Sequence, residues 1–247
     1  MKIVGRTDIG KRRSENQDNY RAGRQADDTV WAVVCDGMGG ARGGAVASGI
    51  AVSVMEDELA DKLVPELSTE EIRSLLEQAV EHANGEIFDL SCADPTKRGM
   101  GTTLVAMVVR NGLAQIVHAG DSRAYLYRDG KMIRLTRDHS MVQEMVENGT
   151  LTPQEAEVHP NKNLITRAVG VNPRLKVEYS ECTAAQGDVF LLCSDGLTNC
   201  TTEEELCDIL EQNDFFASAE EMIQTALEAG GQDNITVVLL KMEATEV

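Results

Sequence analysis

The stretch TLVAMVVRNGLAQIVHAGDSRAYLYRDGKMIRLT, residues 103–136, decides the fold class. Four of its segments have the apolar, β-branched composition of strands: 103–109, 113–119, 123–128 and 131–136. Asn111-Gly112 separates the first two, and Asp129-Gly130 separates the last two. Both pairs favour tight hairpin turns, whose central residues need a positive φ. Four strands joined in this way predict an antiparallel meander rather than a parallel sheet.

The rest of the chain adds strands and paired helices to this meander. Further strands are expected at 29–35, 175–182, 188–193 and 234–242. Helices are expected at 43–63, 68–90, 202–212 and 218–229. The last two are expected to begin at Ser/Thr-x-x-Glu motifs, and the second at the capping box of Ser68. The pattern predicts an α+β fold in which helix pairs flank antiparallel strands, with no linker dividing residues 1–247.

Composition and charge exclude several classes of protein. The formal net charge is −18, which argues against binding to nucleic acid or anionic membranes, because both partners attract clustered Lys and Arg. No window approaches the ~18 consecutive apolar residues that a membrane-spanning helix needs. The six cysteines form no CxxC pair, so a zinc knuckle is not expected. The N-terminal residues lack a signal-peptide core, and we expect a cytoplasmic protein.

Acidic residues recur where apolar runs end near glycines. Four aspartates have this position: Asp36, Asp121, Asp195 and Asp233. Asp18, in SENQDNY, is a fifth candidate. Asp-Gly is also a common turn, so each one alone is weak evidence. Carboxylates that converge need a counter-charge, from arginine or from metal ions. Oxygen donors without a His or Cys cluster favour Mg²⁺ or Mn²⁺ over zinc.

The segment VVCDGMGG, residues 33–40, suggests a purpose for the neighbouring glycines. Gly37 would allow a main-chain carbonyl to face a cation, although a plain turn remains the alternative. Carboxylate-held Mg²⁺ or Mn²⁺ sites commonly handle phosphates. Arg12 and Arg13 could bind a phosphate through planar guanidinium groups, or could belong to a solvated basic patch.

A set of seven motifs carries a family resemblance: RRSENQD, DGMGG, GMGTTL, AGDSRAY, TRDHS, SDGL and GGQDNITVV. Together, from about residue 6 to residue 241, they resemble the metal-dependent Ser/Thr protein phosphatases of the protein phosphatase 2C type, in the compact bacterial form. The resemblance implies a four-layer α-β-β-α sandwich, with two antiparallel sheets flanked by helix pairs. It implies one catalytic domain over 1–247, with a variable flap at about 138–172.

The resemblance also implies roles for individual residues. Asp36 would bridge two metal ions, Mn²⁺ or Mg²⁺, and the carbonyl of Gly37 would bind the first. Asp195 and Asp233 would bind the second. Asp121 would join Asp195 at a possible third ion. Two residues outside this metal set are implied in catalysis: Asp18 would hold metal-bound water and Arg13 would bind the phosphate.

Two positions depart from the family pattern. Met38 stands where many eukaryotic members have a histidine that is proposed to protonate the leaving group, so we expect a water to take that role. His139 is a weaker candidate for it, and a structural role is favoured for this residue. Gln17 replaces a glutamate beside Asp18, which should leave metal binding intact.

The sequence therefore predicts a cytoplasmic protein phosphatase that hydrolyses phosphoserine and phosphothreonine by direct attack of a metal-bridging hydroxide. No CxxxxxR loop or DxDx(T/V) motif suggests a phosphoenzyme. Its partners would be phosphorylated proteins, substrates of a Ser/Thr kinase. A non-catalytic phosphoprotein-binding relative and a metallohydrolase of small phosphate monoesters are the alternatives.

Overall fold

The computed structural model describes residues 1–243, apart from the side chains of residues 40–42, so residues 244–247 of the expected domain lie outside the described part. The strands are β1 (Lys2–Asp8), β2 (Asp18–Arg24), β3 (Val30–Met38), β4 (Gly101–Thr102), β5 (Leu104–Arg110), β6 (Leu113–Ala119), β7 (Arg123–Arg128), β8 (Lys131–Arg134), β9 (Glu178–Thr183), β10 (Val189–Cys193) and β11 (Ile235–Lys241). The helices are α1 (Gly40–Lys62), α2 (Thr69–Ala93), the 3₁₀ helix η1 (Pro95–Lys97), α3 (Met141–Glu147), α4 (Pro153–Glu157), α5 (Asp195–Thr198), α6 (Glu203–Gln212) and α7 (Phe215–Glu228).

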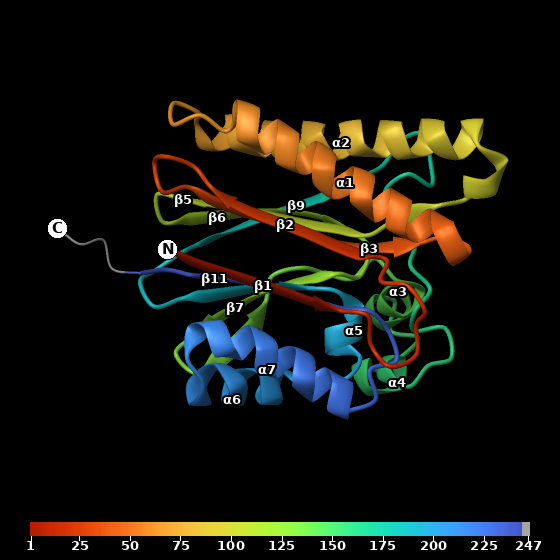
Figure 1. Ribbon diagram of the computed structural model, residues 1–247. Coiled ribbons are helices and arrows are strands. Elements are labelled where there is room, and N and C mark those ends of the chain that lie inside the picture. Colours follow the sequence, from red (N-terminus) through yellow and green to blue (C-terminus); the bar gives the residue numbers. More distant parts are fainter. Residues whose placement is uncertain (244–247) are drawn as a thin grey trace.

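The strands form two antiparallel sheets that pack face to face. One sheet has the order β1-β11-β10-β7-β8, and the other has the order β2-β3-β5-β6-β9, with β4 paired to β3. Helices α1 and α2 cover the second sheet, and α6 and α7 cover the first (Figure 1). The expected α+β sandwich of four layers is confirmed.

The first six residues of strand β3, residues 30–35, are all apolar because both faces of the strand are covered there. Trp31, Val33 and Cys35 belong to the core beneath α1 and α2. The alternate residues Val30, Ala32 and Val34 belong to the core between the two sheets. Side chains of a strand point alternately to opposite faces, so a strand buried on both faces needs an unbroken apolar run. This packing fixes the position of the apolar part of β3, and therefore of Asp36, which follows it in the same strand.

The predicted four-stranded meander is wrong at its centre. Strands β5 and β6 form one hairpin and β7 and β8 form the other, as expected, with positive φ at both turn residues of each. The two hairpins, however, lie in different sheets. The chain crosses between the sheets at Gly120, whose φ is 109° and where a Cβ would lie 2.7 Å from the Thr103 side chain. Strand β9, not β7, pairs with the free edge of β6. The crossover delivers Asp121 to the place where the sheets meet.

Other element boundaries also differ from the sequence expectations. Strands β1 and β2 were not expected, and each is the outermost strand at one edge of its sheet. Strand β9 begins at Glu178 rather than at residue 175. Helix α7 begins at Phe215, because Asp214 caps it by accepting from the backbone N–H groups of Phe216 and Ala217. Ser218, expected to start this helix, lies inside it and donates to the Asp214 carbonyl.

The segment 138–172 is largely irregular, as expected. It contains the two short helices α3 and α4. The capping box of Thr152 and Glu155 begins α4. Both helices lie near the sandwich end at which β3 and α5 are found (Figure 1).

Candidate metal-binding active site

The five predicted acids converge at one end of the sandwich. Asp18 and Asp36 face each other in the register of β2 and β3. Asp195 begins α5 two residues after the end of β10, and Asp233 lies two residues before β11, which pairs with β10. Asp121 lies at the crossover between β6 and β7. Figure 1 shows the end of β3, α5 and the loop after β1 at this same end.

Burial and mutual repulsion raise the pKa values of acids in this cluster. Burial raises the pKa of Asp36 well above its ordinary value, and the charges of the other four acids raise it further. The pKa of Asp18 rises to about 7, chiefly through burial and despite two hydrogen bonds that lower it. Burial and the charge of Asp195 raise the pKa of Asp121 to about 8. Carboxylates arranged in this way cannot all stay ionised at neutral pH without a counter-charge.

Two carboxylate oxygens in the cluster are left without a partner. Asp18 Oδ1 and Asp195 Oδ1 are buried and accept no hydrogen bond from any described residue. The second oxygen of Asp195 is held by Asn199 Nδ2 at 2.9 Å. Leaving a buried charged oxygen unpaired is costly, so the arrangement suits a bound cation. Carboxylate donors select hard ions such as Mg²⁺ and Mn²⁺, and the residues present fit them.

The backbone of Asp36 is anchored by two threonines of the GMGTTL motif. Asp36 N–H donates to Thr103 Oγ1 at 2.9 Å. Its carbonyl accepts from Thr102 Oγ1 and from Thr103 N–H, each at 2.8 Å. Neither threonine is among the site residues predicted from the sequence, although both lie in the GMGTTL motif. They hold the Asp36 main chain in place next to the other acids.

Asp36 and Gly37 lie within β3, so the plain-turn interpretation is wrong for this pair. A Cβ on Gly37 would lie 2.2 Å from the Gly44 carbonyl oxygen of α1, and Gly37 N–H donates to the Gln17 carbonyl at 3.1 Å. Glycine is therefore required here by the close approach of two other segments. Met38, the last residue of the strand, is 36% exposed, and its thioether carries no proton to donate.

Arg13 reaches the acids from the loop between β1 and β2. Its Nη2 atom donates to Asp233 Oδ2 at 2.6 Å, and this bond raises the pKa of Arg13. The side chain is 55% exposed, so the guanidinium group is open to a ligand. Asn234 fixes the loop: its Oδ1 accepts from Gln17 N–H, and its Nδ2 donates to the Ile9 and Glu15 carbonyls, at 2.9–3.0 Å. Sequence reasoning missed this asparagine, although it follows Asp233 directly.

Among the described residues, His139 contacts the backbone of Gly120, the residue before Asp121, and forms no hydrogen bond with the five acids. It is 3% exposed and stacks on His118, with ring centroids 4.6 Å apart. Its Nδ1 accepts from Gly120 N–H at 3.2 Å, and its Nε2 lies 3.2 Å from Glu178 Oε2 and 3.0 Å from Arg167 Nη1. Burial lowers the pKa of His139 to about 4. Contacts to both ring nitrogens favour the structural role for this residue.

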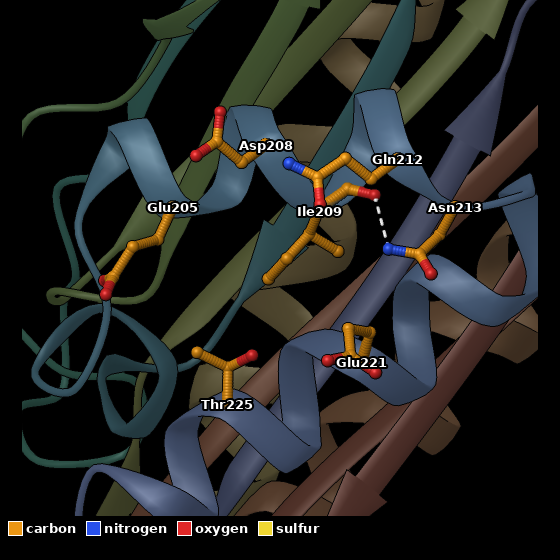
Figure 2. Close-up of a pocket in the computed structure, with 7 residues that line it drawn as sticks. All are labelled: Glu205, Asp208, Ile209, Gln212, Asn213, Glu221 and Thr225. Atoms are coloured by element: carbon orange, nitrogen blue, oxygen red, sulfur yellow. Dashed lines mark hydrogen bonds between the residues drawn. The ribbon is translucent and has the colours of Figure 1, made fainter.

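A second group of acids lies outside the cluster of five aspartates, on the helical layer formed by α6 and α7. Glu205, Asp208 and Glu221 line a cleft of about 230 Å³ between α6 and α7 (Figure 2). All three are exposed to solvent. Exposed acids are hydrated and need no counter-ion, so this cleft serves as a natural control for the buried cluster.

Comparisons with known proteins agree with the geometry. The family model described as "Protein phosphatase 2C" matches residues 5–239. The "Serine/threonine phosphatase stp" of Listeria monocytogenes serotype 4b is 38% identical over 242 residues, which is 98% of this chain and 96% of that protein. The solved structure of the S. agalactiae serine/threonine phosphatase has a TM-score of 0.91 and 34% identity, covering 98% of this chain and 99% of that chain.

A further similar structure contains bound metal ions. The catalytic domain of the serine threonine protein phosphatase PstP, in complex with two manganese ions, has a TM-score of 0.84 and 34% identity, with 96% of both chains covered.

Among the described residues, no helix of this protein has the length and hydropathy needed to span a membrane.

Proposed function

The chain belongs to the protein phosphatase 2C family, and we propose that four of its five converging acids hold the divalent cations with which it hydrolyses phosphoproteins, while the fifth, Asp18, orients water. It is a metal-dependent serine/threonine protein phosphatase. The observation that carries the proposal is the pair of buried, unpartnered oxygens, Asp18 Oδ1 and Asp195 Oδ1, within the cluster of raised pKa values.

We assign the ligands as follows. Asp36, the Gly37 carbonyl, Asp195 and Asp233 would hold two ions, Mn²⁺ or Mg²⁺. Asp121, with Asp195, would hold a third ion. The charges that act on Asp36 come from all four other acids, which supports a single shared site. Such ions, when bound, lower the pKa of water and stabilise charge on phosphoryl oxygens.

The chain's own residues bind and orient the phosphate. Arg13 lies at the rim of the acids with an exposed guanidinium group, suited to bidentate contact with a phosphoryl group. Asn234 holds the loop that carries Arg13, so the arginine stays at the site. Asp18, which pairs with Asp36 in the register of β2 and β3, would orient the attacking water.

Direct hydrolysis, without a covalent phosphoenzyme, is the mechanism that the site favours. Cys35 is the cysteine next to Asp36, and burial raises the pKa of its thiol well above the ordinary value. A thiol that stays protonated is a poor nucleophile. We further propose that the substrates are phosphorylated targets of a Ser/Thr kinase, in the cytoplasm, and that 1–247 forms one catalytic domain with its flap at 138–172.

The proposal is tested by phosphate release from a phosphothreonine peptide, with Mn²⁺ or with EDTA. Asp195→Asn should lower the Mn²⁺-dependent rate of phosphate release by about 10²-fold or more, because it removes an anionic ligand. Asp208→Asn, the same change in the cleft of Figure 2, should leave the rate unchanged. A folded protein with no turnover under any divalent ion would overturn the proposal, as would equal loss in both variants.

A further inference from the structure

Two buried hydroxyl groups contact Asp18 from the other sheet. We propose that Ser194 and Thr236 are positioning residues, which fix one oxygen of Asp18 so that the other is directed at the metal-binding acids. This inference rests on the function proposed above. It concerns residues to which the sequence analysis gave no role.

The contacts are short and confined to one carboxylate oxygen. Ser194 Oγ and Thr236 Oγ1 each donate to Asp18 Oδ2 at 2.7 Å. Both hydroxyl residues are fully buried, and Asp18 is 4% exposed. Its Oδ1 accepts no hydrogen bond from the described residues. A carboxylate held through one oxygen by two donors cannot rotate freely, so the direction of the free oxygen is set.

The direction of each hydrogen bond follows from counting protons. Ser194 Oγ accepts from Thr236 N–H at 3.0 Å, so its own proton is free to go to Asp18. Thr236 Oγ1 also donates its proton to Asp18. In the hydrogen bond of 2.8 Å between the Thr7 and Thr236 hydroxyl groups, Thr7 is therefore the donor. Asn16 Nδ2 in turn donates to Thr7 Oγ1 at 2.9 Å.

Two donor chains therefore end on the same oxygen. One runs from Asn16 through Thr7 and Thr236, and the other runs from the Thr236 backbone through Ser194. Every link donates toward Asp18. Hydrogen bonds in such chains polarise one another, which strengthens the final donation to an ionised carboxylate.

These hydroxyls also connect the two sheets at the site. Asp18 belongs to β2, whereas Thr236 belongs to β11 of the other sheet and Ser194 directly follows β10. Asp195 and Asp233 lie on those same segments, one residue after Ser194 and three before Thr236. The hydroxyl pair therefore fixes Asp18, from one sheet, relative to two proposed metal ligands of the other.

The test is calorimetric titration of the whole protein with Mn²⁺, together with kcat and KM for a phosphothreonine peptide. Thr236→Val, which keeps the shape but removes the donor, should weaken Mn²⁺ binding about 10-fold, at the lower end of the usual effect of outer partners. Its kcat should fall while KM changes little. Thr236→Ser, which keeps the hydroxyl, should restore both values.

A matched control separates positioning from general stability. Ser218→Ala also deletes a fully buried hydroxyl, but one that donates to a helix carbonyl away from Asp18. It should lower the unfolding temperature without changing Mn²⁺ affinity. If Thr236→Val does not fold, Ser194→Ala removes the other donor and carries the same expectation.

The outcomes distinguish the two proposals. Wild type that binds Mn²⁺ and variants that bind it equally well would overturn the positioning role alone. A folded wild type that binds no Mn²⁺ would overturn the proposed metal site, and the positioning role with it. Weakened binding in Thr236→Val and Ser194→Ala, with unchanged binding in Ser218→Ala, is the predicted result.

Discussion

Replacing Asp18 by asparagine should stabilise the metal-free protein. Burial and the neighbouring acids raise the pKa of Asp18 from 3.8 to about 7. A carboxyl whose pKa is raised by folding binds its proton more tightly in the folded state, so ionising it opposes folding. The penalty is absent below pH 3.8, grows as the pH rises, and is complete above pH 7. Asparagine does not titrate, and its amide oxygen can still accept from Ser194 and Thr236.

The size of the effect follows from the pKa. Each pH unit of difference corresponds to 1.36 kcal/mol, so the penalty is about 2 kcal/mol at pH 5 and about 4 kcal/mol at pH 8. A domain of this length shifts its unfolding temperature by about 2–4 °C per kcal/mol. In EDTA, Asp18→Asn should therefore unfold about 4–8 °C above wild type at pH 5 and about 8–16 °C above it at pH 8.

Differential scanning calorimetry between pH 5 and pH 8 measures this difference. Saturating Mn²⁺ should shrink or reverse it, because bound cations would relieve the repulsion in wild type. The variant should also lose Mn²⁺-dependent activity, as a stability gain at a functional site would predict. A variant less stable than wild type in EDTA at pH 8, or a difference that does not grow with pH, would refute the reasoning.

Three further substitutions test residues that lie next to the acids in the structure or in the sequence. Asn234→Asp should lower the free energy of unfolding by about 3 kcal/mol in urea titrations, because it replaces two buried N–H donors with an acceptor facing carbonyls. Arg13→Ala should raise KM for a phosphothreonine peptide about 10-fold or more, whereas Arg12→Ala should change it less than about 2-fold in the same steady-state assay. Met38→Leu should leave kcat within about 2-fold across the pH profile, since neither side chain carries a titrating proton.

The hairpins could be predicted because their turns are encoded locally. Asn111-Gly112 and Asp129-Gly130 adopt the positive φ values that these residue pairs favour. The assignment of the hairpins to different sheets could not be predicted in the same way. The separation of the hairpins depends on β9, which comes more than forty residues after β8 and pairs with the edge of β6. Long-range pairing leaves no mark in the local sequence.

The edge strands and the start of α7 show two other limits. Strands β1 and β2 carry polar residues on faces that stay partly exposed, so their apolar pattern is weak. At α7, Ser218 and Glu221 have the spacing of a capping box, but Asp214 lies one turn earlier and captures the free N–H groups. A competing cap of equal propensity can be resolved only by tertiary packing.

The acids of the site were predictable, whereas the residues that hold them were not. Asp36 stands out because it ends the apolar run of β3. Asp195 stands out because it comes two residues after β10, which is buried throughout. Ser194, Thr236 and Asn234 are polar types that abound on protein surfaces, and their burial appears only once the two sheets are brought together. Their proximity to the acids in the motifs was the available signal.

The most direct test of the central claim is a crystal structure with Mn²⁺, with anomalous difference maps recorded at the manganese absorption edge. The account predicts two strong peaks within bonding distance of carboxylate oxygens of Asp36, Asp195 and Asp233, and none in the exposed cleft of Glu205 and Asp208. Peaks confined to the exposed cleft, or no peak at the buried acids at saturating Mn²⁺, would contradict it.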